Sequence, residues 1–315
     1  MKHFGIIGLL FAFLAVPMFA ADDVTYLALG DSVPFGMNAT LIPPYSSAIP
    51  TASEFIGYPE TVAAARGLKS NQEMNISCPG ETSGSFLNTA VPDNGCNSPH
   101  IIPGVPGVPG VPPYPAIVIP PIKDTPSLLH TPYSGAQMAF AETQLGNKSI
   151  DLVTLSIGAN DILLALPALE ACGTAPNPTT CANGVLGGVL GIYARNLTQI
   201  LNNIRGNQWG QANYQGTLIV VKYYSPTPAL DSVTEALNSE MAQTAAQFPH
   251  VIVADAYTTF QLASLPFKGD ACQAGLLIRL PPSSPYTTTP CDIHPSPLGR
   301  NLLAATVLLA MLLGH

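Results

Sequence analysis

The sequence has few charged residues and no run of cations. Asp, Glu, Lys and Arg make up 10% of the 315 residues, and the formal net charge is −8. A protein that binds nucleic acid needs clustered Lys and Arg side chains to meet the phosphates. We therefore predict no nucleic-acid partner, and the weakly charged composition favours a neutral substrate over a highly charged polymer.

Two motifs are absent from the sequence. It has no G-x-S-x-G, which excludes the sharp nucleophile turn of ordinary α/β-hydrolases. It also has no C-x-x-C spacing, so nothing indicates a zinc site. We expect neither a metal nor a cofactor.

The chain has no apolar run as long as the roughly 20 residues that a membrane span needs. Residues 1–20 show the pattern of a signal peptide, with Lys2, an apolar stretch over 5–16, and a short region that follows Pro17 and ends at Ala20. We expect cleavage near Ala20 and a mature, secreted or periplasmic chain over 21–315. The apolar residues 302–313 are also too short to span a bilayer, and they predict a helix buried against a sheet.

The six cysteines form an even set, which in an exported chain favours disulfides over free thiols. Short loops cost the least closure entropy, so we expect sequence neighbours to pair, although fifteen connectivities are possible. The expected pairs are Cys78 with Cys96, Cys172 with Cys181, and Cys272 with Cys291.

Five strand-like runs alternate with helix-like segments, which predicts an α/β fold with a parallel sheet. The runs lie at 24–29, 72–77, 151–157, 217–223 and 251–254, and the helical segments at about 53–66, 135–145, 186–205, 229–247 and 297–313. Three runs are rich in β-branched residues and nearly continuous in hydrophobicity, which is typical of strands covered on both faces. We expect one domain.

A Pro-rich segment at about 91–132 interrupts this alternation. Its centre repeats Pro-Gly-Val from Pro103, Pro106 and Pro109, a spacing that we expect to form neither helix nor ladder. We predict an extended or polyproline-like insertion on the surface. It could form a substrate lid, but we favour a passive segment.

Chemically useful residues follow several strands, where the carboxyl ends of a parallel sheet gather ligand-binding groups. Gly30-Asp31-Ser32 follows the first strand, Gly80 lies after the second, and Asn160 follows the third. Taken singly these are an ordinary turn, a loop glycine and a helix N-cap. Near the end, His294 is the one histidine with a nearby acid, Asp292. The other mature histidines lack acidic neighbours in sequence and are interpreted as surface residues.

In this order the four segments resemble the sequence blocks of the SGNH hydrolase family, also called GDSL esterases and lipases, from about Tyr26 to Leu303. The resemblance implies a three-layer α/β/α fold with a flavodoxin-like sheet of about five strands. It implies that Ser32 is the nucleophile and His294 the base, and that the N–H groups of Ser32 and Gly80 with the Asn160 amide form the oxyanion hole. The family's acid stands three residues before the histidine, a position occupied here by Cys291, so Asp292 is assigned from two residues before it.

These expectations describe a secreted, monomeric esterase or lipase acting on a small-molecule or lipid acyl ester through an acyl-enzyme. Two alternatives stay open. One is a carbohydrate acetyl esterase of the same fold. The other is an exported binding protein that has lost its chemistry and uses the Pro-Gly-Val segment as a contact surface.

Overall fold

A computed structural model describes residues 24–48, 50–106, 113–146, 149–282 and 289–314. The predicted signal peptide lies outside these residues. The core is a parallel sheet in the order β2-β1-β5-β6-β7, the flavodoxin-like order in which the second strand lies outside the first. Its strands are β1 (Tyr26–Gly30), β2 (Glu73–Asn75), β5 (Leu152–Ser156), β6 (Thr217–Val221) and β7 (Val251–Ala254). The predicted strands and sheet are thereby confirmed.

The sheet is buried on both faces, as its nearly continuous apolar strands require. Every residue of β1 and β5 is buried, and the two strands pair from Tyr26 with Leu152 to Gly30 with Ser156. One polar pair joins these strands inside the core, since the Tyr26 hydroxyl lies 2.9 Å from the hydroxyl of Thr154.

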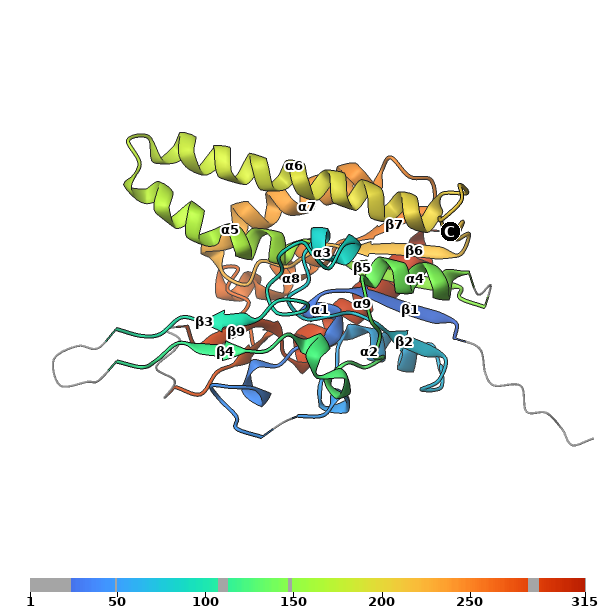
Figure 1. Ribbon diagram of the computed structural model, residues 1–315, viewed down its shortest axis with the longest axis horizontal. Coiled ribbons are helices and arrows are strands. Elements are labelled where there is room, and N and C mark those ends of the chain that lie inside the picture. Colours follow the sequence, from blue (N-terminus) through green and yellow to red (C-terminus); the bar gives the residue numbers. More distant parts are fainter. Residues whose placement is uncertain (1–23, 49, 107–112, 147–148, 283–288, 315) are drawn as a thin grey trace, which may run out of the picture.

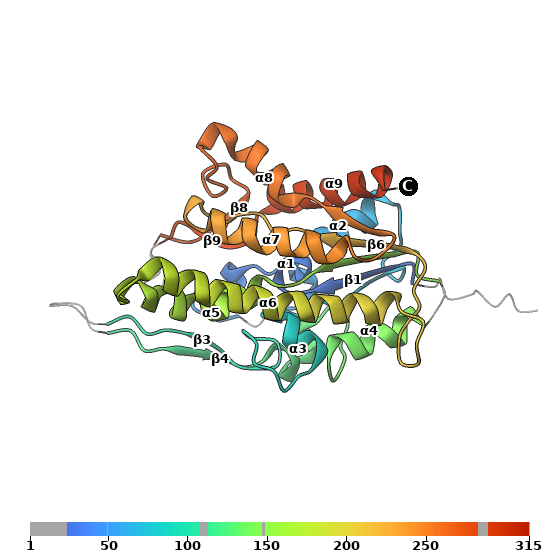
Figure 2. The same cartoon turned by 90° about the horizontal axis from the view of Figure 1, so that it is seen from above.

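Helices form a layer on each face, so the fold has three layers (Figures 1 and 2). One layer holds α2 (Tyr58–Ala65), α8 (Ala256–Ser264) and α9 (Pro297–Leu313), with α9 in contact with α2, α8, β6 and β7. The other layer holds α4 (Gln137–Leu145), α6 (Pro178–Arg205) and α7 (Asp231–Ala245), onto which α3 (Ser83–Leu87) and α5 (Ala159–Ala171) pack. The short helix α1 (Ser32–Phe35) follows β1 directly.

The predicted helices match the structure in place but not always in length. Helix α6 begins at Pro178, eight residues before the predicted start at 186, and α5 and α8 were not predicted. Helix α9 spans the predicted 297–313 and buries Leu303 and Val307, as expected of a helix packed on a sheet. The prediction is wrong for Leu309, Leu312 and Leu313, which are exposed. Among the described helices, none has both the length and the hydrophobicity needed to cross a membrane.

The Pro-rich segment forms a hairpin from β3 (His100–Ile102) and β4 (Ile117–Ile119), which are antiparallel. The expectation that the Pro-Gly-Val repeat joins no ladder is wrong at Val105, which exchanges two 3.0 Å hydrogen bonds with Tyr114. The bridge uses the N–H and C=O of the valine, which lies between Gly104 and Pro106, so no proline needs to supply a donor. Residues 107–112 of the repeat lie outside the described residues.

Short elements complete the chain. An antiparallel pair is made by β8 (Leu277–Arg279) and β9 (Cys291–Pro295), and it immediately precedes α9. Three disulfides join cysteines that are neighbours in the sequence: Cys78–Cys96, Cys172–Cys181 and Cys272–Cys291. The 3-10 helices are η1 (Ala39–Leu41), η2 (Ala52–Glu54), η3 (Ile122–Asp124), η4 (Pro126–Leu128), η5 (Cys172–Thr174), η6 (Pro228–Leu230) and η7 (Leu265–Phe267).

Candidate active site

Ser32 stands at the end of β1 as the first residue of α1. The preceding turn needs glycine, because Gly30 has φ of +133° and a Cβ there would lie 1.9 Å from the carbonyl oxygen of Ser156. Asp31 then caps the helix, since its carboxylate accepts a 3.0 Å hydrogen bond from the N–H of Val33. The turn at the carboxyl end of β1 therefore fixes where the Ser32 hydroxyl lies.

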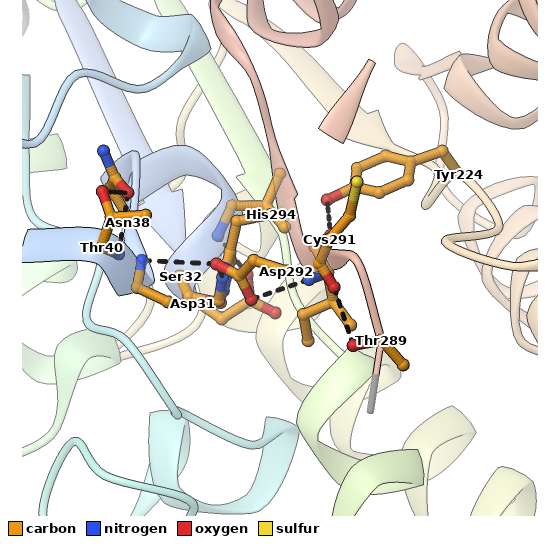
Figure 3. Close-up of polar contacts among 12 residues, drawn as sticks. Asp31, Ser32, Asn38, Thr40, Tyr224, Thr289, Cys291, Asp292 and His294 are labelled. Carbon is orange, nitrogen blue, oxygen red and sulfur yellow. Dashed lines mark hydrogen bonds and ion pairs between the residues drawn. The ribbon is translucent and has the colours of Figure 1, made fainter. Parts of the chain in front are cut away.

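His294 connects the serine to an acid (Figure 3). Its Nε2 lies 2.8 Å from Ser32 Oγ, and its Nδ1 lies 2.7 Å from Asp292 Oδ2. A carboxylate only accepts hydrogen bonds, so Nδ1 carries the ring proton and Nε2 is free to accept the serine proton. The acid two residues before the histidine thus reaches the imidazole, although the family pattern places the acid three residues before.

Asp292 is held by backbone donors as well. Its Oδ1 accepts a 2.7 Å hydrogen bond from the N–H of Ile293, and its Oδ2 accepts a 3.3 Å bond from the N–H of Ala39. The strand that carries Asp292 and His294 is fixed by the Cys272–Cys291 bond and by the Tyr224 hydroxyl, which donates to the Ile293 carbonyl at 2.7 Å. Figure 3 shows Asp292, His294 and Tyr224 around β9.

The pair has opposite pKa shifts. Burial would raise the pKa of Asp292, but the charge of His294 and the hydrogen bonds that the carboxylate accepts hold it below its usual value. Burial would also lower the pKa of His294. The carboxylate of Asp292, its hydrogen bond and the more distant charge of Asp31 outweigh that effect and hold the pKa above 6.5. The side chains of His294 and Asp292 are each 12% exposed, so solvent screens the pair weakly.

Gly80 and Asn160 lie at the same cavity as the serine. Gly80 has φ of +84°, and a Cβ there would lie 2.3 Å from the backbone of Asn94, which only glycine avoids. The Asn160 amide donates to the carbonyl of Glu81 at 3.1 Å, which leaves it a second N–H. Gly158, not Asn160, is the N-cap of α5, so the ordinary interpretation of Asn160 as a helix cap is wrong.

One cavity of about 480 Å³ brings the sequence-predicted residues together. Its lining includes Ser32, Gly80, Asn160, Asp292 and His294. Acyl transfer requires hydrogen-bond donors beside an activated hydroxyl, and these five residues lie around one cavity. The arrangement is therefore chemically able to attack an ester carbonyl and stabilise its oxyanion.

A tyrosine that supports the site was not found from the sequence. The Tyr223 hydroxyl donates to Asp31, although the two lie 192 positions apart. Burial raises the pKa of Asp31 to about 6, and the hydrogen bond from Tyr223 opposes that shift only in part. The sequence places Asp31 next to Ser32, but it contains no signal that links Asp31 to Tyr223.

A buried amide ties the serine loop to the glycine loop. Gln137 accepts from the N–H of Gly30 at 2.7 Å, and it donates to the Gly30 carbonyl at 2.9 Å and to the Glu81 carboxyl group. Burial raises the pKa of Glu81 to about 8. Because the Glu81 carbonyl also holds Asn160, this bridge connects three loops of the site.

Two histidines expected at the surface are not simple surface residues. His130 Nε2 lies 2.9 Å from the Phe35 carbonyl oxygen and 3.8 Å from a Glu60 carboxylate oxygen, an acidic neighbour distant in sequence. His100 lines the cavity, and its Nδ1 lies 3.0 Å from Asn94 Oδ1. Both contacts are tertiary, so sequence neighbours could not reveal them.

One group of possible metal ligands lies close together among the described residues. Cys78, Glu81 and Cys96 come close enough together to share an ion. The two cysteines are bonded to each other, so they offer no thiolate and the set does not fit a metal.

The chain belongs to the GDSL-like lipase/acylhydrolase family, whose sequence model matches residues 28–302. Among solved structures, it is similar to phospholipase A1 from Streptomyces albidoflavus NA297, with 15% identity and a TM-score of 0.50 over 91% of this chain and 99% of that one. It is also similar to an extracellular lipase from Streptomyces rimosus, with 16% identity and a TM-score of 0.49 over 91% and 99%. A lipase from a goat rumen metagenome has 16% identity and a TM-score of 0.47 over 91% and 97%. No curated protein matches the sequence. At such identities the structural likeness defines the fold alone.

Proposed function

We propose that the protein is an exported serine esterase that hydrolyses carboxylic acyl esters through an acyl-enzyme. The observation that carries the proposal is the continuous chain of contacts from Ser32 Oγ to His294 Nε2 at 2.8 Å and from His294 Nδ1 to Asp292 at 2.7 Å. A serine hydroxyl becomes a useful nucleophile only beside such a base. Three disulfides support the assignment to an oxidising compartment.

In the first half of the reaction, Ser32 Oγ attacks the ester carbonyl carbon while His294 Nε2 takes the hydroxyl proton. The carbonyl oxygen becomes an oxyanion, which the N–H groups of Ser32 and Gly80 and the Asn160 amide stabilise. The C–O bond to the alcohol then breaks, and His294 gives its proton to the departing oxygen. Asp292 stabilises the imidazolium and keeps its ring oriented.

In the second half, water takes the place of the alcohol. His294 removes one water proton as the oxygen attacks the acyl carbon, and the same three donors hold the new oxyanion. The bond to Ser32 Oγ breaks, the serine recovers its proton from His294, and the carboxylic acid leaves. No group outside the chain other than water is needed.

The test compares the wild type with Ser32→Ala in two assays. We expect a fluorophosphonate probe to label the wild type alone, and p-nitrophenyl acetate to be hydrolysed by the wild type at a rate at least about 10³-fold above the variant. Thr40→Ala, in which a hydroxyl near the site is removed, is a control that should keep labelling. A wild type that is neither labelled nor active would favour the non-catalytic binding protein.

A further inference from the structure

Two cavities meet at Ser32, and they differ about sixfold in size. One has a volume of about 480 Å³ and the other about 80 Å³. They share five lining residues: Ser32, Asn160, Leu163, Ile293 and His294. An ester carbonyl carries two arms, the acyl chain and the alcohol, so a carbonyl placed at Ser32 has a separate cavity available for each arm.

The large cavity is wide enough for a bulky ligand, since sites for small molecules usually have about 300–1,000 Å³. Part of its wall comes from the β3–β4 hairpin, where Ile102 pairs with Ile117 and both line the cavity. Figures 1 and 2 show the hairpin at the same end of the molecule as β9. The segment expected to be passive therefore forms part of the wall of the candidate site.

The small cavity lies between helices α5 and α7. Leu166 contributes from α5, Val233 and Leu237 from α7, and Tyr224 from the loop after β6. None of its lining residues is Asp, Glu, Lys or Arg. A water molecule needs about 10–15 Å³ of such volume, so the cavity holds the equivalent of about five to eight waters. That space fits an unbranched chain of a few carbons.

The chemistry decides which arm each cavity takes. The acyl arm stays bonded to Ser32 through both halves of the reaction, whereas the alcohol leaves and water must take its place beside His294. The large cavity contains the whole set of proposed groups, including Gly80 and Asp292, and has room for this exchange. The small cavity contains neither Gly80 nor Asp292.

Building on the proposed function, we propose that the substrate is an ester of a short acyl chain, about two to four carbons, with a bulky apolar alcohol. The small cavity between α5 and α7 measures the acyl chain, and Val233 and Leu166 set its limit. The large cavity holds the alcohol against the β3–β4 hairpin.

The first test measures kcat/KM on p-nitrophenyl acetate, butyrate and octanoate. The wild type should prefer acetate and butyrate over octanoate by at least about 10-fold, since one methylene too many in an apolar pocket costs roughly 10–200-fold. Val233→Phe should reduce butyrate hydrolysis by at least about 10-fold and leave acetate within about threefold. Ser232→Phe places the same ring at the exposed neighbouring position of α7 and should leave kcat/KM on both substrates unchanged.

Enlarging the small cavity should have the opposite effect. Leu166→Ala should increase octanoate hydrolysis relative to acetate by about 10-fold, a gain that a misfolded protein cannot produce. For the large cavity, Ile117→Trp should reduce kcat/KM on 2-naphthyl acetate by at least about 10-fold and leave ethyl acetate within about threefold. Ile101→Trp, at a position 60% exposed, is its control.

The outcomes separate the two proposals. Fluorophosphonate labelling together with faster hydrolysis of octanoate than of butyrate, or with no effect of Val233→Phe and Leu166→Ala on the chain-length profile, would overturn the assignment of the arms and leave the esterase intact. Absence of labelling and of hydrolysis for every ester would overturn the proposed function, and the inference with it.

Discussion

Replacing Asp292 by Asn tests the least expected member of the proposed triad. The substitution keeps the size of the side chain and removes its charge, which lies 2.7 Å from His294 Nδ1. An opposite charge at such a distance changes a pKa by about 1–3 units, and one unit corresponds to about 1.4 kcal/mol. Because both side chains are 12% exposed, solvent screens little of this effect.

The expected result has two parts. In the wild type, kcat/KM should rise with pH through an apparent pKa above 6.5, because His294 must be neutral to act as a base and its pKa is raised. In Asp292→Asn this limb should move to lower pH, since the carboxylate no longer favours the imidazolium. The plateau rate should fall by up to about 10⁴-fold, because an amide can donate to Nδ1 and favour the wrong tautomer.

The assay is the hydrolysis of p-nitrophenyl acetate from pH 5 to 9, corrected for the spontaneous rate. Ala39→Gly serves as a control, because it keeps the backbone N–H that donates to Asp292. A variant whose limb stays in place and whose plateau stays within threefold of the wild type would refute the role of Asp292. A backbone carbonyl or another acid would then have to orient His294.

Three further predictions concern the groups around the serine. Asn160→Ala should lower kcat by about 10²–10³-fold with little change in KM, through loss of an oxyanion donor, and a kcat within threefold of the wild type would contradict this. Asp31→Asn should move the pH limb of kcat/KM downward by less than Asp292→Asn does, because Asp31 raises the pKa of His294 without bonding to it; an upward shift would contradict this. Glu81 has a folded-state pKa raised to about 8, so its stabilising contribution is complete below pH 4.5 and is lost as pH rises through 8. Glu81→Gln should therefore flatten the fall in Tm between pH 5 and 8, and a wild-type Tm that does not fall over this range would contradict the assignment.

The sheet could be predicted from the sequence because its strands carry a strong local signal. Residues 218–221, for example, are all apolar and three of the four are β-branched, a pattern typical of a buried strand. Helices were harder to predict from the sequence where they contain residues that disfavour helix formation. Gly184 lies in the missed first turns of α6, residues 178–185, and a glycine costs about 1 kcal/mol in a helix. Helix α5 was not predicted because it contains Pro167, a residue that disfavours the interior of a helix.

Part of the candidate site could be predicted from the sequence, and part could not. Ser32 and His294 were identified through sequence blocks, and the fold brings them within 2.8 Å of each other. The bonds that support them join side chains with no shared motif, such as Asp31 with Tyr223. Such pairs arise only from how the chain packs, so composition and periodicity carry no trace of them. The two cavities could not be predicted from the sequence for the same reason.

The bond between Cys272 and Cys291 has a practical consequence for producing the protein. It closes a loop of about 20 residues at the strand that carries both Asp292 and His294, and a crosslink of this span typically contributes about 3 kcal/mol. A cell compartment that keeps thiols reduced would yield chains without this disulfide, in which Ser32 keeps its position but the proposed base His294 is poorly fixed. Batches with correct mass and near-normal helix content could then differ widely in specific activity. Titration of free thiols would distinguish them before any substrate is added.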